Sequence, residues 1–117
     1  MIYYKKSRAF VSQAVAVGMI LSGVTIADDF VVSQRDRQFQ LNDHAIEMLT
    51  AKVGDTVHFR NEDSFFHNVY SGSEKQPFDL GSYPRGFQRS VTLRQTGELL
   101  VECGLHATMK MKVYITN

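Results

Sequence analysis

The sequence predicts an all-β domain, built either as a two-layer sandwich or as a barrel. Apolar and polar residues alternate along several short segments, and clusters of turn-forming residues separate these segments. The alternation has the period of a strand, and no comparable stretch repeats with the period of a helix. Many short strands joined by turns in about 90 residues are typical of sandwiches and barrels.

Strands are expected where β-branched, aromatic and alternating residues fall between turn signals. In chain order they are 30–33, 38–41, 56–60, 67–71, 89–93, 98–102 and 110–115. A short apolar run, 46–49, precedes the third of them. At the end of the chain, Met109, Met111, Val113 and Ile115 share one face, because side chains two residues apart lie on the same side of a strand.

Turn chemistry divides these strands. A Gly-Asp pair at 54–55 precedes the third strand, and Asn-Glu-Asp-Ser at 61–64 ends it. Residues 43–48 are expected to form a helical turn. The least regular stretch, 72–86, holds three glycines and two prolines. We expect a loop there, or a short edge segment over one end of the sandwich.

The first residues resemble a targeting signal rather than part of the fold. Three basic residues and no acid occupy 1–8, and an apolar run at 9–26 follows. The run ends in Thr25-Ile26-Ala27, a small-x-small cleavage pattern. The sequence therefore predicts a secretory signal peptide at 1–27 and one domain at 28–117. The alternative is an uncleaved membrane anchor, for which the polar residues in the run are unfavourable.

The charge of the expected mature chain excludes one class of partner. Removing the leader removes three of the 13 Lys and Arg residues and none of the 12 Asp and Glu residues, which leaves a net charge of −2. No basic patch or lysine run remains, so nucleic acid is not an expected partner. No other segment is apolar and long enough to span a membrane, so we expect no span after cleavage.

The chain has a single cysteine, Cys103, although export usually brings an oxidising compartment and paired cysteines. Three interpretations remain: a buried inert thiol, an intermolecular disulfide or a metal-bound thiolate. We favour the metal-bound thiolate because His106 and Met109 follow so closely. Coordination would also shield the sulfur from oxidation, since it leaves no free thiolate to react.

The residues that carry chemistry are one thiolate, two imidazoles and a thioether. Cys103, His106 and Met109 lie in a tight loop between two expected strands, and His67 begins its own strand after a turn. Loops at one end of a sandwich allow such side chains to converge. Two imidazoles and a thiolate in a plane, with a weak axial thioether, form a mononuclear copper site for electron transfer. Four protein donors leave no open position for a substrate, which argues against an enzyme.

These motifs resemble those of the cupredoxin family of blue copper proteins, in particular its amicyanin-like and small plastocyanin-like members. The loop Cys103-x-x-His106-x-x-Met109 and the strand that follows it resemble amicyanin loops. His-Asn-Val at 67–69 matches the family's element of that sequence, and it follows a strand of the family's Gly-Asp-Thr-Val type at 54–61. Phe-Asp-Leu-Gly at 78–81 adds a weaker similarity. The resemblance covers nearly all of residues 30–117.

The resemblance implies a Greek-key β-sandwich with one type 1 copper ion at one end. It implies His67, Cys103 and His106 as equatorial ligands and Met109 as the axial ligand. Loops of the related pseudoazurin type place the axial methionine two residues later, so Met111 is the alternative. The loop departs from the family pattern at 104 and 107, where Gly and Ala stand in place of the frequent Thr and Pro.

The resemblance also implies a role for Asn68 beside the ligands. Its backbone N–H would donate a hydrogen bond to the sulfur of Cys103, and its side chain would tie the two ligand loops together.

The ring edge of His106 is expected to be exposed, and the resemblance implies that this edge is the port for electrons. Four apolar residues are candidates for a ring around it, although ordinary packing would explain each of them equally well: Phe65, Phe66, Pro84 and Ala107. The two other histidines, His44 and His58, are expected on the surface. His58 alternates with two apolar neighbours that should face the core.

The function predicted from these residues is a periplasmic blue copper protein that carries single electrons between redox partners. Its expected partners are a donor and an acceptor protein, such as an amine dehydrogenase or a c-type cytochrome, and the chain is expected to be a monomer. The alternative is a copper-binding module that sequesters or delivers the metal without redox turnover. A copper oxidase or reductase would need further histidines, and a metal-free sandwich used in adhesion or assembly is the fourth interpretation.

Overall fold

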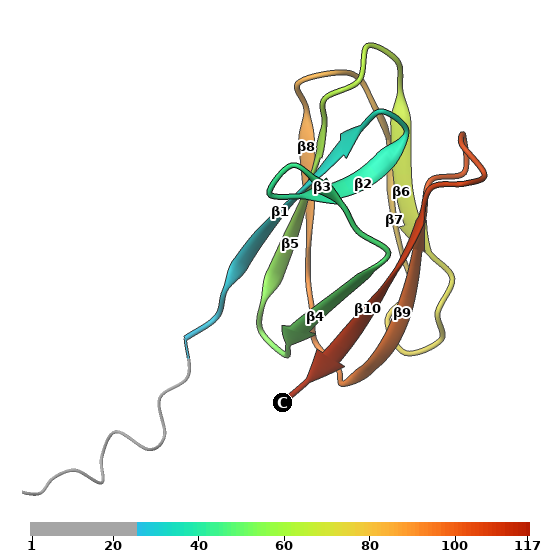
Figure 1. The fold of residues 1–117 in the computed structure, drawn as a ribbon. Coiled ribbons are helices and arrows are strands. Elements are labelled where there is room, and N and C mark those ends of the chain that lie inside the picture. Colours follow the sequence, from blue (N-terminus) through green and yellow to red (C-terminus); the bar gives the residue numbers. More distant parts are fainter. Residues whose placement is uncertain (1–25) are drawn as a thin grey trace, which may run out of the picture.

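A computed structural model describes residues 26–117, in which ten strands form two five-stranded sheets (Figure 1). The first sheet contains, in spatial order, β3 (His44–Ala45), β2 (Gln38–Leu41), β1 (Asp29–Arg35), β5 (Thr56–Asn61) and β8 (Gln88–Thr92). The second contains β4 (Met48–Lys52), β10 (Lys110–Thr116), β9 (Gly97–Glu102), β6 (His67–Ser71) and β7 (Phe78–Tyr83). All but the last two residues of the predicted signal peptide lie outside the described residues.

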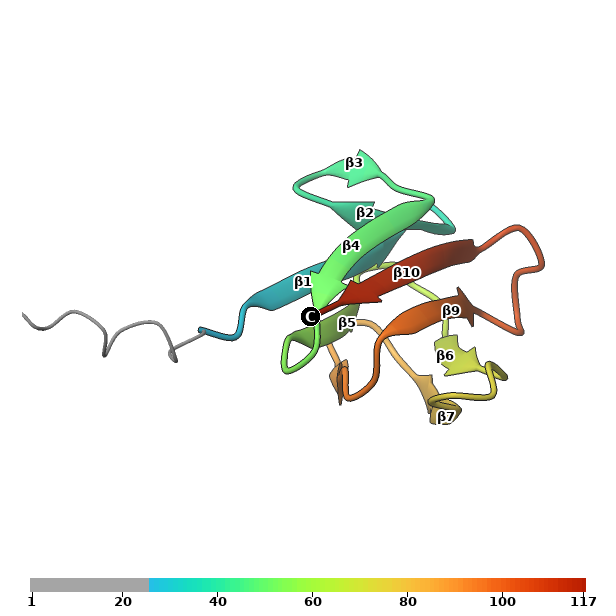
Figure 2. The ribbon, with the colours of Figure 1, turned by 90° about the horizontal axis from the view of Figure 1, so that it is seen from below.

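The two sheets lie face to face, as the view from below shows (Figure 2). Successive elements often lie in different sheets: β3 belongs to the first sheet, β4 to the second and β5 to the first again. Most neighbours are antiparallel, but β1 lies parallel to β5 and β10 lies parallel to β4. The predicted all-β Greek-key sandwich is therefore confirmed, and the two separate sheets exclude the barrel.

Alternating side chains from both sheets fill the space between them. Val32 and Phe59 from the first sheet, and Val69 and Val113 from the second, are at most 1% exposed. The predicted inward face of the last strand is confirmed, because its four apolar residues are all buried while Lys110 and Lys112 are exposed. Burial of apolar area on this scale is the main force that holds the sheets together.

Two consecutive hairpins follow β1, and the second of them occupies part of the stretch 43–48, where the sequence predicted a helical turn. Asp36 and Arg37 join β1 to β2, and Asn42 and Asp43 join β2 to β3, with φ between 52° and 65° at all four residues. Positive φ at both central residues is the geometry of a two-residue hairpin loop. The helical turn was wrong because this loop reverses the chain, so that residues 44–45 pair with β2 instead.

The irregular stretch 72–86 contains β7, which pairs with β6 at the edge of the second sheet. Of the two expectations for this stretch, the edge segment is confirmed and the structureless loop is wrong. Glycine and proline are compatible with an edge strand because one side of the strand has no partner. The pairing shifts register between Asn68 and Tyr70, which bends β6 just after its first residue.

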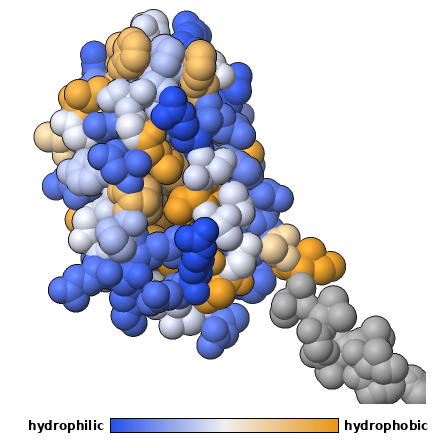
Figure 3. Space-filling view, turned by 180° about the vertical axis from the view of Figure 1, so that it is seen from behind, coloured by the Kyte–Doolittle hydropathy of each residue, from blue (hydrophilic) through white to orange (hydrophobic). Residues whose placement is uncertain are grey.

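The face seen from behind is mostly hydrophilic, with small patches of apolar side chains (Figure 3). The expected surface positions of two histidines are confirmed: His44 is exposed, and His58 lies on the outer face of β5 against Ser90 and Asp29. Within residues 26–117 we find no helix with the length and apolar character that crossing a bilayer requires.

Candidate metal centre

The loop 103–109 joins β9 to β10 at the end of the sandwich opposite the C-terminus (Figure 1). Three backbone hydrogen bonds fold it tightly. The N–H of His106 donates to the carbonyl of Cys103 at 3.3 Å, and the N–H of Met109 donates to the carbonyl of His106 at 2.9 Å. The N–H of Cys103 donates to the carbonyl of Met109 at 3.1 Å. The loop is thus closed at its base by the two strands and held internally by its own backbone.

His67, the first residue of β6, meets this loop from the neighbouring strand. Its Nδ1 lies 3.6 Å from the sulfur of Cys103, and Nδ1 of His106 lies 3.6 Å from the same sulfur. The three donor atoms lie within 4.8 Å of one another. Imidazole nitrogens and thiolate sulfurs bind metals at about 2.0–2.3 Å, so donors in a plane around one ion stand about 3.5–4 Å apart. The two sulfur–nitrogen distances match this spacing, so the three side chains form a candidate mononuclear metal site.

Burial differs among the three side chains. His67 is 0% exposed and Cys103 is 2% exposed, whereas His106 is only half-buried. Two donors therefore lie inside the fold, and the third lies between the interior and the solvent. A site of this kind excludes water from the sulfur while it leaves one ligand at the surface.

Asp63 holds the ring of His67 in place. Its carboxylate accepts a hydrogen bond from Nε2 of His67 at 2.7 Å and two more from the backbone N–H groups of Asp36 and Arg37, at 2.8 and 3.1 Å. Because Nε2 is occupied, Nδ1 is the nitrogen that faces Cys103. A carboxylate behind a histidine orients the ring and makes it a better metal ligand.

The pairing of Asp63 with His67 is visible in their pKa values. Burial opposes charge on both groups, yet hydrogen bonds outweigh it. Hydrogen bonds from His67 and from the backbone of residues 36 and 37 lower the pKa of Asp63. Hydrogen bonds to Cys103 and Asp63 raise the pKa of His67. Sequence reasoning missed Asp63, although an acid in the turn four residues before a candidate ligand was a usable signal.

Asn61 fixes the turn that presents these side chains. Its amide nitrogen donates to the carbonyls of Phe65 at 2.8 Å and Tyr83 at 2.9 Å, and its oxygen accepts from the N–H of Asp63 at 2.8 Å. The side chain is 0% exposed, so water cannot replace these bonds. A buried asparagine thus positions both Asp63 and the chain leading to His67.

Asn68 connects the start of β6 to the loop 103–109. Its side-chain oxygen accepts a hydrogen bond from the N–H of Gly104 at 2.6 Å, and its backbone N–H donates toward the sulfur of Cys103. Burial opposes ionisation of Cys103, but hydrogen bonds from His67, His106 and Asn68 outweigh it and lower the pKa of Cys103 to about 6. The lowered pKa favours the thiolate, which is the form that binds metal.

The fold and this cluster have counterparts among known proteins. Over 80 residues the chain is 30% identical to the methylamine utilization protein MauL of Methylorubrum extorquens, across 64% of this chain and 70% of the relative. Among solved structures, a Cu(I) form of an amicyanin variant superposes with a TM-score of 0.64 and 22% identity, over 80% of this chain and 87% of that chain. A reduced amicyanin variant superposes with a TM-score of 0.65 and 23% identity, again over 80% of this chain and 87% of that chain. This chain belongs to the cupredoxin family.

No family model matches the sequence, so the assignment rests on these relatives and on the structure. The likeness to the two amicyanin structures concerns the fold. The predicted resemblance to cupredoxins is thereby confirmed. In this cupredoxin, a soft thiolate and two imidazoles converge at one end of the sandwich, and this donor set fits a copper ion.

The two candidate axial methionines of the cupredoxin occupy different positions, although each is 1% exposed. Met109 lies in the loop, where its backbone forms hydrogen bonds with the backbone of both Cys103 and His106. Met111 lies inside β10, paired with Val101 of β9. The backbone therefore brings Met109, and not Met111, to the level of the other candidate ligands.

Phe65 packs against both histidines, whose own ring centroids lie 4.8 Å apart, at this end of the cupredoxin. Its ring centroid lies 5.2 Å from that of His67 and 5.1 Å from that of His106. On its other side, the guanidinium carbon of Arg37 lies 4.7 Å from the Phe65 centroid. Phe65 is half-buried and packed against both rings, so it serves as packing beside the site.

Exposed apolar side chains occur in the two segments that carry the histidines. Phe66 is 54% exposed and Leu105 is 53% exposed, while Ala107 is exposed and Pro84 is half-buried. Phe66 and Ala107 were predicted near His106, and Leu105 was missed. Its place between Cys103 and His106 in the sequence was a signal that could have found it.

Proposed function

We propose that this cupredoxin is a blue copper protein that carries single electrons between redox partners. His67, Cys103 and His106 would be the equatorial ligands of one type 1 copper ion, and Met109 would be the axial ligand. The observation that carries the proposal is the convergence of a buried sulfur with two imidazole nitrogens, each 3.6 Å away, at one end of a rigid sandwich. This is the donor set of copper electron-transfer sites.

Bound copper would supply a one-electron couple between Cu(II) and Cu(I). The work of the chain is to keep the donors in one arrangement in both states. Two sheets, the closed loop 103–109 and the Asp63 and Asn68 hydrogen bonds restrain the four side chains. Little has to move when the charge changes, which keeps the reorganisation energy small. Burial of Cys103 and His67 keeps water away from the metal.

We infer that the chain has no catalytic role of its own. Four protein donors would complete the coordination of copper and leave no open position, whereas a catalytic metal site keeps one for water or substrate. Electrons would enter and leave through the ring of His106, the only half-buried member of the three-residue cluster among residues 26–117.

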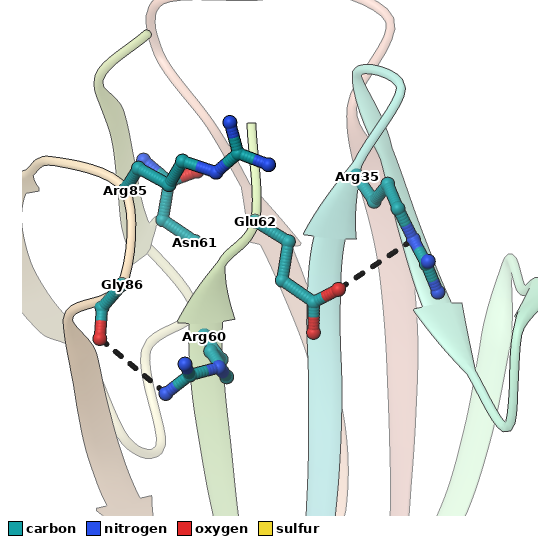
Figure 4. Close-up of a pocket in the computed structure, with 6 residues that line it drawn as sticks. All are labelled: Arg35, Arg60, Asn61, Glu62, Arg85 and Gly86. Carbon is teal, nitrogen blue, oxygen red and sulfur yellow. Dashed lines mark hydrogen bonds and ion pairs between the residues drawn. The ribbon is translucent and has the colours of Figure 1, made fainter. Parts of the chain in front are cut away.

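The surface beside His106 supports docking of another protein. The exposed side chains of Phe66 and Leu105 supply apolar contact area, as the centre of a protein interface requires. On one flank, a pocket of about 430 Å³ is lined by Arg35, Arg60, Asn61, Glu62, Arg85 and Gly86 (Figure 4). It connects to the site through Asn61, whose side chain holds the backbone of Phe65.

The charge of this flank favours an acidic partner. Arg35 is paired with Asp43 and Glu62, but Arg60 and Arg85 form no ion pair with any other residue in the range 26–117. Arg60 instead donates to the carbonyl of Gly86 at 3.3 Å (Figure 4). Two uncompensated guanidinium groups beside an apolar patch would receive carboxylates from the edge of a partner protein.

The proposed setting is the periplasm, after export and removal of residues 1–27. A domain at 28–117 without a membrane span would diffuse there as a monomer between a donor and an acceptor. The relative named for methylamine utilization makes an amine dehydrogenase a natural candidate donor, with a c-type cytochrome as acceptor. Nucleic acid is not a proposed partner, because binding it requires an extended basic surface.

The test is the visible spectrum of the copper-loaded mature protein. Oxidised protein should show an intense thiolate-to-copper absorption that bleaches on reduction and returns on oxidation. Cys103→Ala should abolish this absorption and leave a folded β protein by circular dichroism, whereas Leu105→Ala, in the same loop, should keep it.

Two results would count against the proposal. An unchanged spectrum in Cys103→Ala would exclude a copper–thiolate site. A coloured protein that does not cycle between oxidation states would favour the alternative function, sequestration or delivery of copper.

A further inference from the structure

Asp28 is anchored to the fold through its backbone, just ahead of β1. Its N–H donates to Oδ1 of Asp55 at 2.8 Å, and its carbonyl accepts from the N–H of Thr56 at 3.0 Å. The two preceding residues are exposed, with Ile26 at 78%. Ala27, the last residue of the predicted leader, is thus followed directly by Asp28, which is hydrogen-bonded to the fold.

The acceptor of that bond, Asp55, is a buried carboxylate in the turn between β4 and β5. Its side chain is 1% exposed, and its second oxygen accepts from the backbone N–H of Lys52 at 2.8 Å. The ammonium of Lys52 lies 3.3 Å from Oδ1 of Asp55 and 2.9 Å from the carboxylate of Asp28. The backbone N–H of Asp28 lowers the pKa of Asp55 more than any other contact, against the opposing effect of burial.

These charges do not balance in the uncleaved chain. One ammonium, that of Lys52, serves two carboxylates, those of Asp28 and Asp55, and the neutral amide of Asp28 supplies the closest donor to Oδ1. A hydrogen bond from an ammonium to a carboxylate is stronger than one from a neutral amide. The backbone nitrogen of Asp28 already lies where such a positive charge would contact Asp55.

We propose that hydrolysis of the Ala27–Asp28 peptide bond creates an α-ammonium group that forms an ion pair with the buried carboxylate of Asp55, and that this pair stabilises the mature domain. The reaction consumes one water molecule and needs an endopeptidase of the secretory route. Ala27 leaves with a carboxylate, and the nitrogen of Asp28 becomes –NH₃⁺. Nothing else in the fold has to move.

The position of the cut decides the result. Cleavage after Ala27 turns a nitrogen that is 2.8 Å from Asp55 from a neutral donor into a cation, and the local cluster then has two positive and two negative groups. Cleavage one residue earlier leaves a neutral amide at that nitrogen and places the new charge on exposed Ala27. The structure therefore assigns a specific partner, Asp55, to one specific processing product.

Thermal unfolding of two chains of different length tests the proposal. One chain begins at Asp28 and the other keeps Ala27, each released from a fusion by a protease that leaves no extra residue. We expect the chain that begins at Asp28 to unfold about 4–8 °C higher, as a partly buried charge-assisted bond allows in a domain of this size. Equal melting temperatures would overturn the proposal.

Substitution of the acceptor makes the comparison specific. In Asp55→Asn the difference between the two chain lengths should vanish, whereas in Asp29→Asn, which removes the neighbouring carboxylate that contacts His58, it should persist. A difference in melting temperature that persists between the two chain lengths of Asp55→Asn would also overturn the proposal.

Chemical modification provides a readout that does not depend on folding of the Asp55 variant. Cyanate reacts with uncharged amines, so an α-amino group held as an ammonium by Asp55 should be carbamylated several-fold more slowly than the α-amino group of the chain that begins at Ala27. Equal rates would contradict the ion pair. Mass spectrometry of the chain after export must also give Asp28 as the first residue, and another first residue would exclude the proposed cut.

Discussion

At the scale of single residues, the orientation of His67 depends on a side chain that binds no metal in the proposed site. Asp63 receives Nε2 of His67 and two backbone N–H groups from the β1–β2 hairpin loop. It therefore couples the position of a candidate ligand to a turn in the opposite sheet. The hairpin loop, with its positive φ values, is part of the support of the site even though it contributes no donor.

Asp63→Ala should weaken copper binding by about 10–100-fold, the usual effect of removing a carboxylate behind a metal-bound histidine. The free energy of unfolding of the metal-free protein should also fall by about 1–3 kcal/mol, because the buried Nε2 of His67 loses its partner. Competition with a copper chelator and urea unfolding measure the two effects. Asp43→Asn, in the next hairpin loop, removes an exposed ion pair and should change neither. Unaltered copper affinity in Asp63→Ala would refute the orienting role.

Met109→Gln should lower the reduction potential and shift the visible spectrum. An amide oxygen is a harder donor than a thioether, so it favours Cu(II) over Cu(I). Met111→Gln buries an amide in the core opposite Val101, and it should leave the spectrum unchanged while it lowers the free energy of unfolding by about 1–3 kcal/mol. Voltammetry, absorption spectra and urea unfolding measure these effects. The reverse ranking of the two spectra would assign Met111 as the axial ligand.

At the scale of elements, β7 contributes more than an edge to the second sheet. Its last residue, Tyr83, pairs with His67 across the two strands and is 0% exposed. The hydroxyl of Tyr83 donates to Oε1 of Gln34 on β1 at 2.8 Å and approaches the carbonyl of Phe59 on β5 at 3.1 Å. Burial raises the pKa of Tyr83, so the hydroxyl keeps its proton and stays a donor. This side chain joins the two sheets next to the metal end.

Tyr83→Phe should therefore destabilise the sandwich, although it removes only one oxygen atom. Oε1 of Gln34 would remain buried without its donor, which costs about 1–3 kcal/mol in the free energy of unfolding. Urea unfolding of the metal-free protein measures the loss. Tyr114→Phe, on the outer face of β10, is the matched control and should stay within about 0.5 kcal/mol of the parent. Equal effects of the two substitutions would show that the link between the sheets contributes nothing.

At the scale of the whole molecule, the two ends of the sandwich carry different groups of functional side chains. One end carries the histidine and cysteine cluster together with the uncompensated Arg60 and Arg85. The other carries the start of β1 and the β4–β5 turn, where Asp28, Lys52 and Asp55 form a local charge cluster (Figure 1). The expected mature chain is slightly acidic, so a preference for an acidic partner would come from where the arginines lie and not from the net charge.

Electron transfer to an acidic protein should depend on those arginines. Suitable acceptors are native cytochrome c, which is basic, and its succinylated form, which has the same fold and is acidic. In the double variant Arg60→Gln/Arg85→Gln, the rate with the acidic form should fall by about tenfold at low ionic strength, and the difference should shrink above about 0.1 M salt. Stopped-flow kinetics measure these rates, and calorimetric titration at low salt measures binding without electron transfer.

The control is Lys75→Gln/Arg94→Gln, which changes the net charge by the same amount. Arg94 follows β8, and Lys75 packs against Gly97 at the start of β9. The arginines of the proposed docking flank lie elsewhere, Arg60 near the end of β5 and Arg85 just after β7. The control should keep the parent rate within about twofold. If both double variants lost the same rate, net charge and not the arginine flank would steer the partner. A protein that is blue and redox-active but indifferent to all four substitutions would retain the proposed function without this docking surface.

Local pattern was enough to predict much of this fold. Alternation of apolar and polar residues depends only on neighbours in the chain, so the strands at 56–60, 67–71 and 98–102 and the buried face of the last strand followed from it. The grouping of Cys103, His106 and Met109 within seven residues made the type of site readable for the same reason. Short separation along the chain leaves few ways for such side chains to avoid one another.

The folded structure alone decided the features that depend on which segments pair with one another. The pairing of 44–45 with β2 replaced the expected helical turn, and β7 formed at an edge because β6 offered it a partner. Asp63 became the support of His67 only because the β1–β2 hairpin loop folds over it, and Asp55 met the backbone of Asp28 across 27 residues of chain. Alternation along the chain does not show which segments become neighbours, because these hydrogen bonds form only when folding brings the segments together.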